Sequence, residues 1–105
     1  EKNNIPKDIL SSIQEIESYE VNNIKLNLNI AFNYGTEEEI INIVKKSIKN
    51  KFQEKDINND IIKSLSYLKD FSDPDILIRT GGHQRLSNFL LLNLKYTELF
   101  FTSTL

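Results

Sequence analysis

The pattern of apolar and polar residues predicts alternating helices and strands in the first half of the chain. Apolar residues recur at helical spacing over residues 6–18, which is typical of an amphipathic helix. Over residues 26–32 they alternate with polar residues, which indicates a strand with one polar-tolerant face. A second helix is predicted from Thr36, which forms a capping box with Glu39. Five apolar residues of this helix are expected to face inward: Ile40, Ile41, Ile43, Val44 and Ile48.

The second half of the chain continues the alternation. Residues 51–58 are polar and predict a loop, and Asn59 or Asp60 is expected to cap a short helix carrying Ile61, Ile62, Leu65 and Leu68. Residues 76–78 predict a buried strand, residues 89–94 a buried helix and residues 99–101 a last strand. Strands separated by helices favour a parallel sheet with right-handed crossovers. We therefore predict an α/β fold, a mostly parallel open sheet flanked by helices.

Composition excludes several classes of protein. The 105 residues carry a net charge of −2, which argues against nucleic-acid binding by charge alone. There is no cysteine, so neither a disulfide framework nor a thiolate metal site is expected. No apolar run approaches the roughly 20 residues that span a bilayer. The sequence also lacks methionine, and we interpret it as part of a longer protein.

Rare residues gather in one predicted loop. The two arginines of the chain, Arg79 and Arg85, lie there with its single histidine, His83, and with Gly81 and Gly82. Arginine presents a planar fork of donors that grips carboxylate or phosphate through two parallel hydrogen bonds. The loop follows a predicted strand and precedes a predicted helix, an order in which free backbone N–H groups and the helix dipole bind phosphate. This pattern indicates an anion site.

Other interpretations of these residues stay open at this point. A structural loop with two solvated arginines and a helix capped by Ser87 or Asn88 would show the same pattern. Gly35 follows the predicted strand of residues 26–32 and serves either a tight turn or close approach to a ligand. By its spacing alone, Glu98 would be an ordinary exposed acid at the start of a strand.

Two stretches resemble one enzyme family. The stretch D-P-D-I-L-I-R-T-G-G-H-Q-R-L-S-N-F-L-L, followed by Y-T-E-L-F-F, extends from Asp73 to Phe101. It resembles the C-terminal signature of the cis-prenyltransferases, the undecaprenyl and dehydrodolichyl diphosphate synthases. The stretch L-N-L-N-I-A-F-N-Y-G at residues 26–35 resembles the family's strand that ends in N-Y-G. The resemblance implies that residues 1–105 are the C-terminal portion of a single cis-prenyltransferase domain and have the fold of that portion. The N-terminal half of the domain, which carries the aspartate loop, is absent from this sequence.

The resemblance also implies a reaction and a set of site residues. The family condenses isopentenyl diphosphate with an allylic diphosphate, such as farnesyl diphosphate, and forms a cis double bond. Arg79, Arg85 and Ser87 match the positions that hold isopentenyl diphosphate, and Glu98 matches the acid associated with Mg²⁺. Further loop contributors would be Gly81, Gly82, His83 and Asn33. No catalytic residue is assigned in this portion, and we expect the chain alone to be inactive.

The resemblance leaves partners and an alternative function to be tested. We expect a dimer, either of two copies or with an accessory subunit, and no nucleic acid. The location expected is the cytoplasm or the periphery of a membrane such as the endoplasmic reticulum or a plastid-like organelle, with membrane contact made through the product. The alternative is a non-catalytic accessory subunit or a diphosphate-binding module of the same superfamily. Two departures from the family pattern are His83, where glutamate is usual, and Thr36-Glu37, where glycine and arginine often follow N-Y-G.

Overall fold

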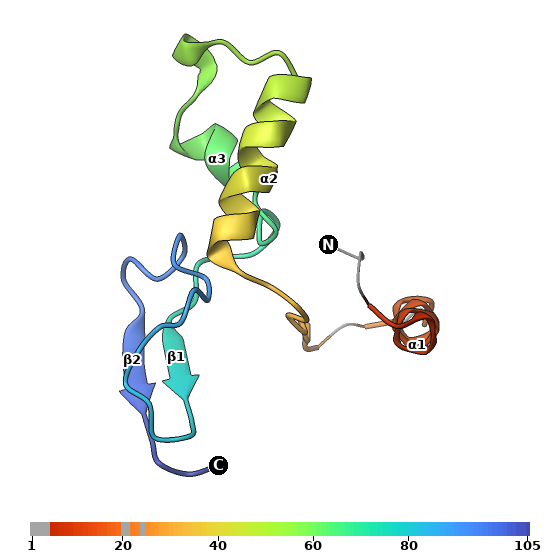
Figure 1. The fold of residues 1–105 in the computed structure, drawn as a ribbon, viewed down its shortest axis with the longest axis vertical. Helices are drawn as coiled ribbons and strands as arrows, with labels where there is room; N and C mark the ends of the chain where they lie inside the picture. The colour runs from red at the N-terminus through yellow and green to blue at the C-terminus, as the bar shows by residue number, and fades with distance from the viewer. Residues whose placement is uncertain (1–4, 20–21, 24) are drawn as a thin grey trace. The chain divides into compact units, whose positions relative to one another are not determined.

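The computed structural model describes residues 5–19, 22–23 and 25–105, and the chain divides into two compact units, residues 1–33 and 34–105 (Figure 1). The first unit contains helix α1 (Lys7–Glu17). The second unit contains helix α2 (Thr36–Lys49), the 3-10 helix η1 (Glu54–Asp56), helix α3 (Asn59–Leu65) and the strands β1 (Ile76–Arg79) and β2 (Glu98–Phe101). None of the helices that the structure describes has both the length and the apolar composition of a membrane span.

The first unit confirms the predicted helix but not the predicted strand. Helix α1 begins directly after Pro6, whose carbonyl oxygen accepts a hydrogen bond from Leu10 N at 3.0 Å. Residues 26–32 form no strand, and Leu26, Leu28 and Ile30 are each at least 77% exposed. An alternating sequence becomes a strand only when a neighbouring chain satisfies its backbone N–H and C=O groups. No such neighbour pairs with this segment among the described residues.

The helices of the second unit bury less apolar surface than the sequence predicted. Helix α2 packs against α3, and of its five predicted inward residues only Ile43 is buried. The other four are 44–72% exposed, because the short helix α3 covers only a narrow part of the α2 surface. Helix α3 begins one residue earlier than expected, since its cap is Asn58, whose Oδ1 accepts from Ile61 N at 3.0 Å. Leu68 lies beyond the end of α3.

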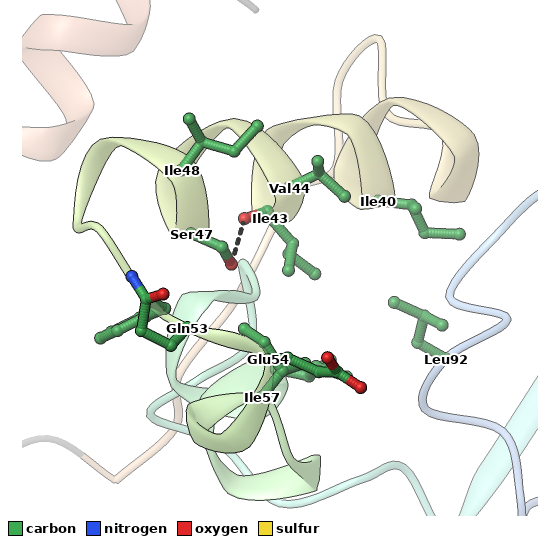
Figure 2. Close-up of a pocket in the computed structure, with 11 residues that line it drawn as sticks. Ile40, Ile43, Val44, Ser47, Ile48, Gln53, Glu54, Ile57 and Leu92 are labelled. Carbon is green, nitrogen blue, oxygen red and sulfur yellow. Dashed lines mark hydrogen bonds between the residues drawn. The ribbon is translucent and has the colours of Figure 1, made fainter.

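An open apolar pocket of about 500 Å³ lies beside α2. Figure 2 shows Ile40 of α2 on one side of it and Leu92 on the other. Its lining comes from α2, from residues 52–62 and from Leu92, and contains no arginine, lysine or histidine. The pocket is therefore distinct from the predicted anion site.

The two strands pair in parallel, as predicted. The arrows of β1 and β2 lie side by side and point the same way (Figure 1). Ile76 lies opposite Glu98, and Arg79 lies opposite Phe101. The expectation that β1 is buried is wrong, since Ile76 and Ile78 are 58% and 68% exposed. A parallel strand is buried when further strands and helices cover both faces of its sheet. The sheet of the described residues has two strands only, and both are short.

The predicted helix over residues 89–94 is absent. Turns take its place, and three residues close together have left-handed backbone: Ser87, Asn88 and Leu90, with φ of 51°, 59° and 50°. A right-handed helix needs φ near −63°, so these residues cannot continue one. The segment instead runs from the end of the glycine loop to the start of α2, where it makes the contacts described below.

Candidate functional site

Arg79 and Ser87, two of the predicted site residues, contact each other in the structure. Arg79 is the last residue of β1, and its Nη1 donates a hydrogen bond to Ser87 Oγ at 2.7 Å. The same nitrogen also donates to the backbone carbonyl oxygen of Arg85. The guanidinium therefore holds its own loop closed across eight residues of sequence.

One edge of the Arg79 guanidinium is left for a ligand. A guanidinium has five N–H donors, two of them on Nη1, and both Nη1 donors are used within the loop. Nε and Nη2 carry the other three, and none of these bonds to a residue that the structure describes. This edge matches the two-oxygen spacing of a phosphate or carboxylate, so it can bind such a group through two parallel hydrogen bonds.

The other predicted side chains of the loop are open to solvent. Arg85 and His83 are exposed, and Arg85 takes part in the loop contacts through its backbone carbonyl. The segment from Arg79 to Tyr96 contains no acidic residue, so the local charge is positive. Asn33 is the last residue of the first unit, exposed and with a left-handed φ of 52°.

The glycine pair shapes the loop but does not offer free amides. Gly81 and Gly82 have φ of 84° and 74°, a region that side chains disfavour. Gly81 N donates to Thr104 O at 2.8 Å and Gly82 N to Thr102 O at 2.9 Å. The predicted phosphate cradle of backbone N–H groups and a helix N-terminus is therefore wrong. An anion at this site would depend on side chains, chiefly Arg79.

The predicted capping box is also wrong, because a residue distant in the sequence accepts the hydrogen bonds of the first amides of α2. Asn88 caps the helix: its backbone oxygen accepts from Thr36 N at 2.9 Å and its Oδ1 accepts from Glu37 N at 3.1 Å. The Thr36 hydroxyl donates to Asn88 O at 3.2 Å and accepts from Leu91 N at 3.0 Å. Asn88 was predicted to cap a helix near Phe89 and instead caps one that precedes it by about fifty residues.

Gly35 allows this contact. Its backbone is extended, with φ of −150°, so the tight turn that we considered does not explain it. A Cβ atom at this position would lie 2.9 Å from Asn88 Nδ2, which is too close. The glycine therefore serves the close approach of the Asn88 side chain.

Glu39 connects the start of α2 to other segments through its buried side chain. The sequence predicted for it only a role in the capping box. Glu39 is 1% exposed, and its carboxylate accepts from the Tyr34 hydroxyl at 2.5 Å and from Tyr67 N at 2.8 Å. Burial, followed by the hydrogen bond to the Glu39 carboxylate, raises the pKa of Tyr34 to about 12. The Tyr34 ring also stacks edge-on against Tyr67 and Phe89, at centroid distances of 6.0 and 5.6 Å. No local pattern indicates the contacts with Tyr67 and Phe89, because these residues are far from Tyr34 and Glu39 in the sequence.

The residues that the structure describes do not assemble a magnesium site beside the loop. Glu98, the predicted ligand, is exposed at the start of β2 and pairs with Ile76, whereas Arg79 pairs with Phe101. The two residues are three register positions apart, roughly 10 Å along the strands. Within the described residues, no group of three His, Asp or Glu side chains could hold a metal. Mg²⁺ prefers one or two carboxylates with phosphate oxygens and waters, so Glu98 would need ligands from outside these residues.

Comparison with known proteins identifies the family. The family described as "Putative undecaprenyl diphosphate synthase" matches residues 1–105. The chain belongs to this family. An isoprenyl transferase of Fusobacterium nucleatum is 44% identical to it over 104 residues, which cover 99% of this chain and 44% of that protein. Dehydrodolichyl diphosphate synthase 3 of Arabidopsis thaliana is 41% identical over 107 residues, covering 96% of this chain and 35% of that protein.

Solved structures of the undecaprenyl diphosphate synthase family confirm the predicted α/β fold. A probable undecaprenyl diphosphate synthase from Campylobacter jejuni has a TM-score of 0.84 and 30% identity over the whole of this chain and 48% of that one. Lavandulyl diphosphate synthase from Lavandula x intermedia, in complex with dimethylallyl diphosphate, has a TM-score of 0.85 and 27% identity, covering 100% of this chain and 47% of that one. The chain thus spans less than half the length of the relatives that it matches.

Proposed function

We propose that this chain provides the isopentenyl diphosphate-binding part of a cis-prenyltransferase. The observation that carries the proposal is the contact of Arg79 with its loop, which fixes the guanidinium while leaving Nε and Nη2 for an oxyanion. The membership in the undecaprenyl diphosphate synthase family supports the same interpretation.

Each residue would have a defined role in binding. Arg79 would grip the diphosphate through its remaining edge, and the exposed side chain of Arg85 would supply a second guanidinium. The hydroxyl of Ser87, already bonded to Arg79, would accept or donate a further hydrogen bond at the same place. Bound in this way, isopentenyl diphosphate would be held for head-to-tail condensation with an allylic diphosphate such as farnesyl diphosphate, with release of diphosphate.

Further parts of the proposal rest on the family alone. Mg²⁺, when bound, would stabilise the charge on the leaving diphosphate, and Glu98 is the residue of this chain that we expect to contribute to holding it. A dimer, of two copies or with an accessory subunit, stays a prediction, as does contact with a membrane surface through the product.

Calorimetry tests the binding function directly. The chain is titrated with isopentenyl diphosphate, and the result is compared for the wild type, Arg79→Lys and Arg79→Ala. Lysine keeps the positive charge but cannot donate two parallel hydrogen bonds, and alanine has neither property. We therefore expect both variants to bind isopentenyl diphosphate about ten- to a hundred-fold more weakly. Lys95→Ala is the matched control, since Lys95 is an exposed cation of the same acid-free segment and should not matter. Unchanged binding by Arg79→Ala would remove this residue from the site and the proposal with it.

A further inference from the structure

Asn88 joins the start of α2 to the loop that carries Ser87. Its backbone oxygen and its Oδ1 accept hydrogen bonds from Thr36 N and Glu37 N, the first two amides of the helix. These amides have no partner within the helix itself, so Asn88 supplies what a local cap would otherwise supply. The residue that precedes Asn88 is Ser87, whose hydroxyl meets the Arg79 guanidinium at 2.7 Å.

The loop around Asn88 needs such an anchor. Ser87 and Leu90 have left-handed backbone, which ordinary side chains disfavour, whereas asparagine tolerates it better. Unfavourable backbone of this kind persists when surrounding contacts hold it in place. The Thr36 hydroxyl supplies two of these contacts, one to Asn88 O and one from Leu91 N. Helix α2 therefore holds the segment from Asn88 to Leu91 from one side.

The packing around the Asn88 side chain leaves little room for another arrangement. A Cβ atom at Gly35 would lie 2.9 Å from Asn88 Nδ2 and 3.7 Å from Asn88 Cγ. The carboxamide is thus held between the helix amides and the backbone of Gly35. Loss of these side-chain contacts would leave the backbone of Asn88, and with it the adjacent Ser87, less firmly held.

We infer that Asn88 is a positioning residue: by capping α2 it fixes Ser87 against Arg79 and so sets the geometry with which the loop grips a diphosphate. Asn88 need not touch the ligand for this role. The inference deepens the proposed function and rests on it, because it concerns the affinity of the same loop.

A pair of matched variants separates positioning from simple stabilisation. Asn88→Gly removes the capping side chain and still accommodates the left-handed backbone. Asn58→Gly removes the same kind of cap from α3, where Asn58 Oδ1 accepts from Ile61 N, away from the arginine loop. Both variants lose one asparagine cap, so we expect comparable losses of thermal stability. Only Asn88→Gly should bind isopentenyl diphosphate more weakly, by about tenfold or more.

A third variant approaches the same contact from the other side. Gly35→Ala keeps the asparagine at position 88 but places a Cβ atom against its Nδ2, so the side chain must move. We expect this variant to weaken isopentenyl diphosphate binding as Asn88→Gly does. Equal affinities of the wild type, Asn88→Gly and Gly35→Ala would overturn the inference, as would an equal loss of affinity in Asn58→Gly.

The inference and the proposed function can fail separately. If the wild type does not bind isopentenyl diphosphate, the proposed function fails, and the positioning role is then tested without ligand. In ¹H–¹⁵N NMR spectra, the Arg79 Nε–H and Ser87 amide signals should shift in Asn88→Gly and stay in place in Asn58→Gly. Signals of Asn88→Gly that coincide with those of the wild type would show that Asn88 does not position the loop.

Discussion

The Glu39 carboxylate accepts a hydrogen bond from the Tyr34 hydroxyl at 2.5 Å, across five residues of sequence at the start of α2. Its other oxygen accepts from Tyr67 N at 2.8 Å, in the segment that follows α3. Glu39 is almost completely buried, and a buried carboxylate is tolerated only when its oxygens find donors. This acid therefore joins three segments of the second unit through its side chain and the helix that carries it.

Replacement of Glu39 by alanine should destabilise the chain. The change leaves Tyr67 N without its acceptor in a part-buried place, removes the acceptor of the Tyr34 hydroxyl and opens a cavity. We expect a loss of about 2–4 kcal/mol in the free energy of unfolding. Urea denaturation followed by circular dichroism measures it.

Glu37→Ala is the control for this prediction. Glu37 lies in the same first turn of α2 but is exposed, and a negative charge at this end of the helix interacts favourably with the helix dipole. Its loss should cost about 0.3–1 kcal/mol. If the two variants were equally stable, the carboxylate of Glu39 would contribute nothing beyond its charge at the helix start.

Alkaline pH should weaken the contact between Tyr34 and Glu39. The pKa of Tyr34 is raised from 10.0 to about 12 in the folded chain, so the folded state keeps the hydroxyl proton that the unfolded state loses. The stability due to this proton is fully present below pH 10 and is lost as the pH rises from 10 towards 12.

The variant Tyr34→Phe tests this pH dependence. Phenylalanine cannot ionise, so the contribution of this position to the slope between pH 10 and 12 should disappear. Tyr96→Phe, at a tyrosine that is 95% exposed, serves as the control and should leave the slope unchanged. Thermal unfolding at closely spaced pH values gives the slopes, and a Tyr34→Phe curve parallel to that of the wild type would refute the role of Tyr34.

Substitutions of Gly82 should follow the left-handed preference of the new residue. Its φ is 74°, and a Cβ atom there would come no closer than 3.9 Å to Ser103 Cα, so conformation rather than space decides. We expect Gly82→Asn to be the mildest change, Gly82→Ala to cost about 1–2 kcal/mol and Gly82→Val to cost most. Melting temperatures of the three variants give the order, and a valine variant as stable as the asparagine variant would contradict it.

The chain by itself should not synthesise polyprenyl products. It spans 44% of the Fusobacterium isoprenyl transferase, and its described residues contain no cluster of metal ligands. Incubation with Mg²⁺, radiolabelled isopentenyl diphosphate and farnesyl diphosphate should give no labelled extractable product. Substantial product would show that these residues suffice for catalysis, and the arginine loop would then have to be reconsidered as a complete site.

The sequence by itself determined those features that depend on neighbouring residues. The amphipathic spacing predicted α1 and α2, the apolar runs predicted β1 and β2, and the order of elements predicted their parallel pairing. The cluster of rare residues also predicted a loop after Arg79, and the family resemblance added Ser87 to the site residues of this loop. Periodicity and composition report these features because helices, strands and short loops are built from contacts that are close in sequence.

Tertiary structure alone decided which groups form hydrogen bonds with the start of α2 and with the arginine loop. Thr36 and Glu39 have the local spacing of a capping box, yet the contacts to Asn88 and Tyr67 replaced it. The apolar run at residues 89–94 favoured a helix, but the backbone turns there to reach α2. Hydrogen bonds between segments that are distant in sequence outweighed local preference in both places, and local preference is all that a single sequence displays.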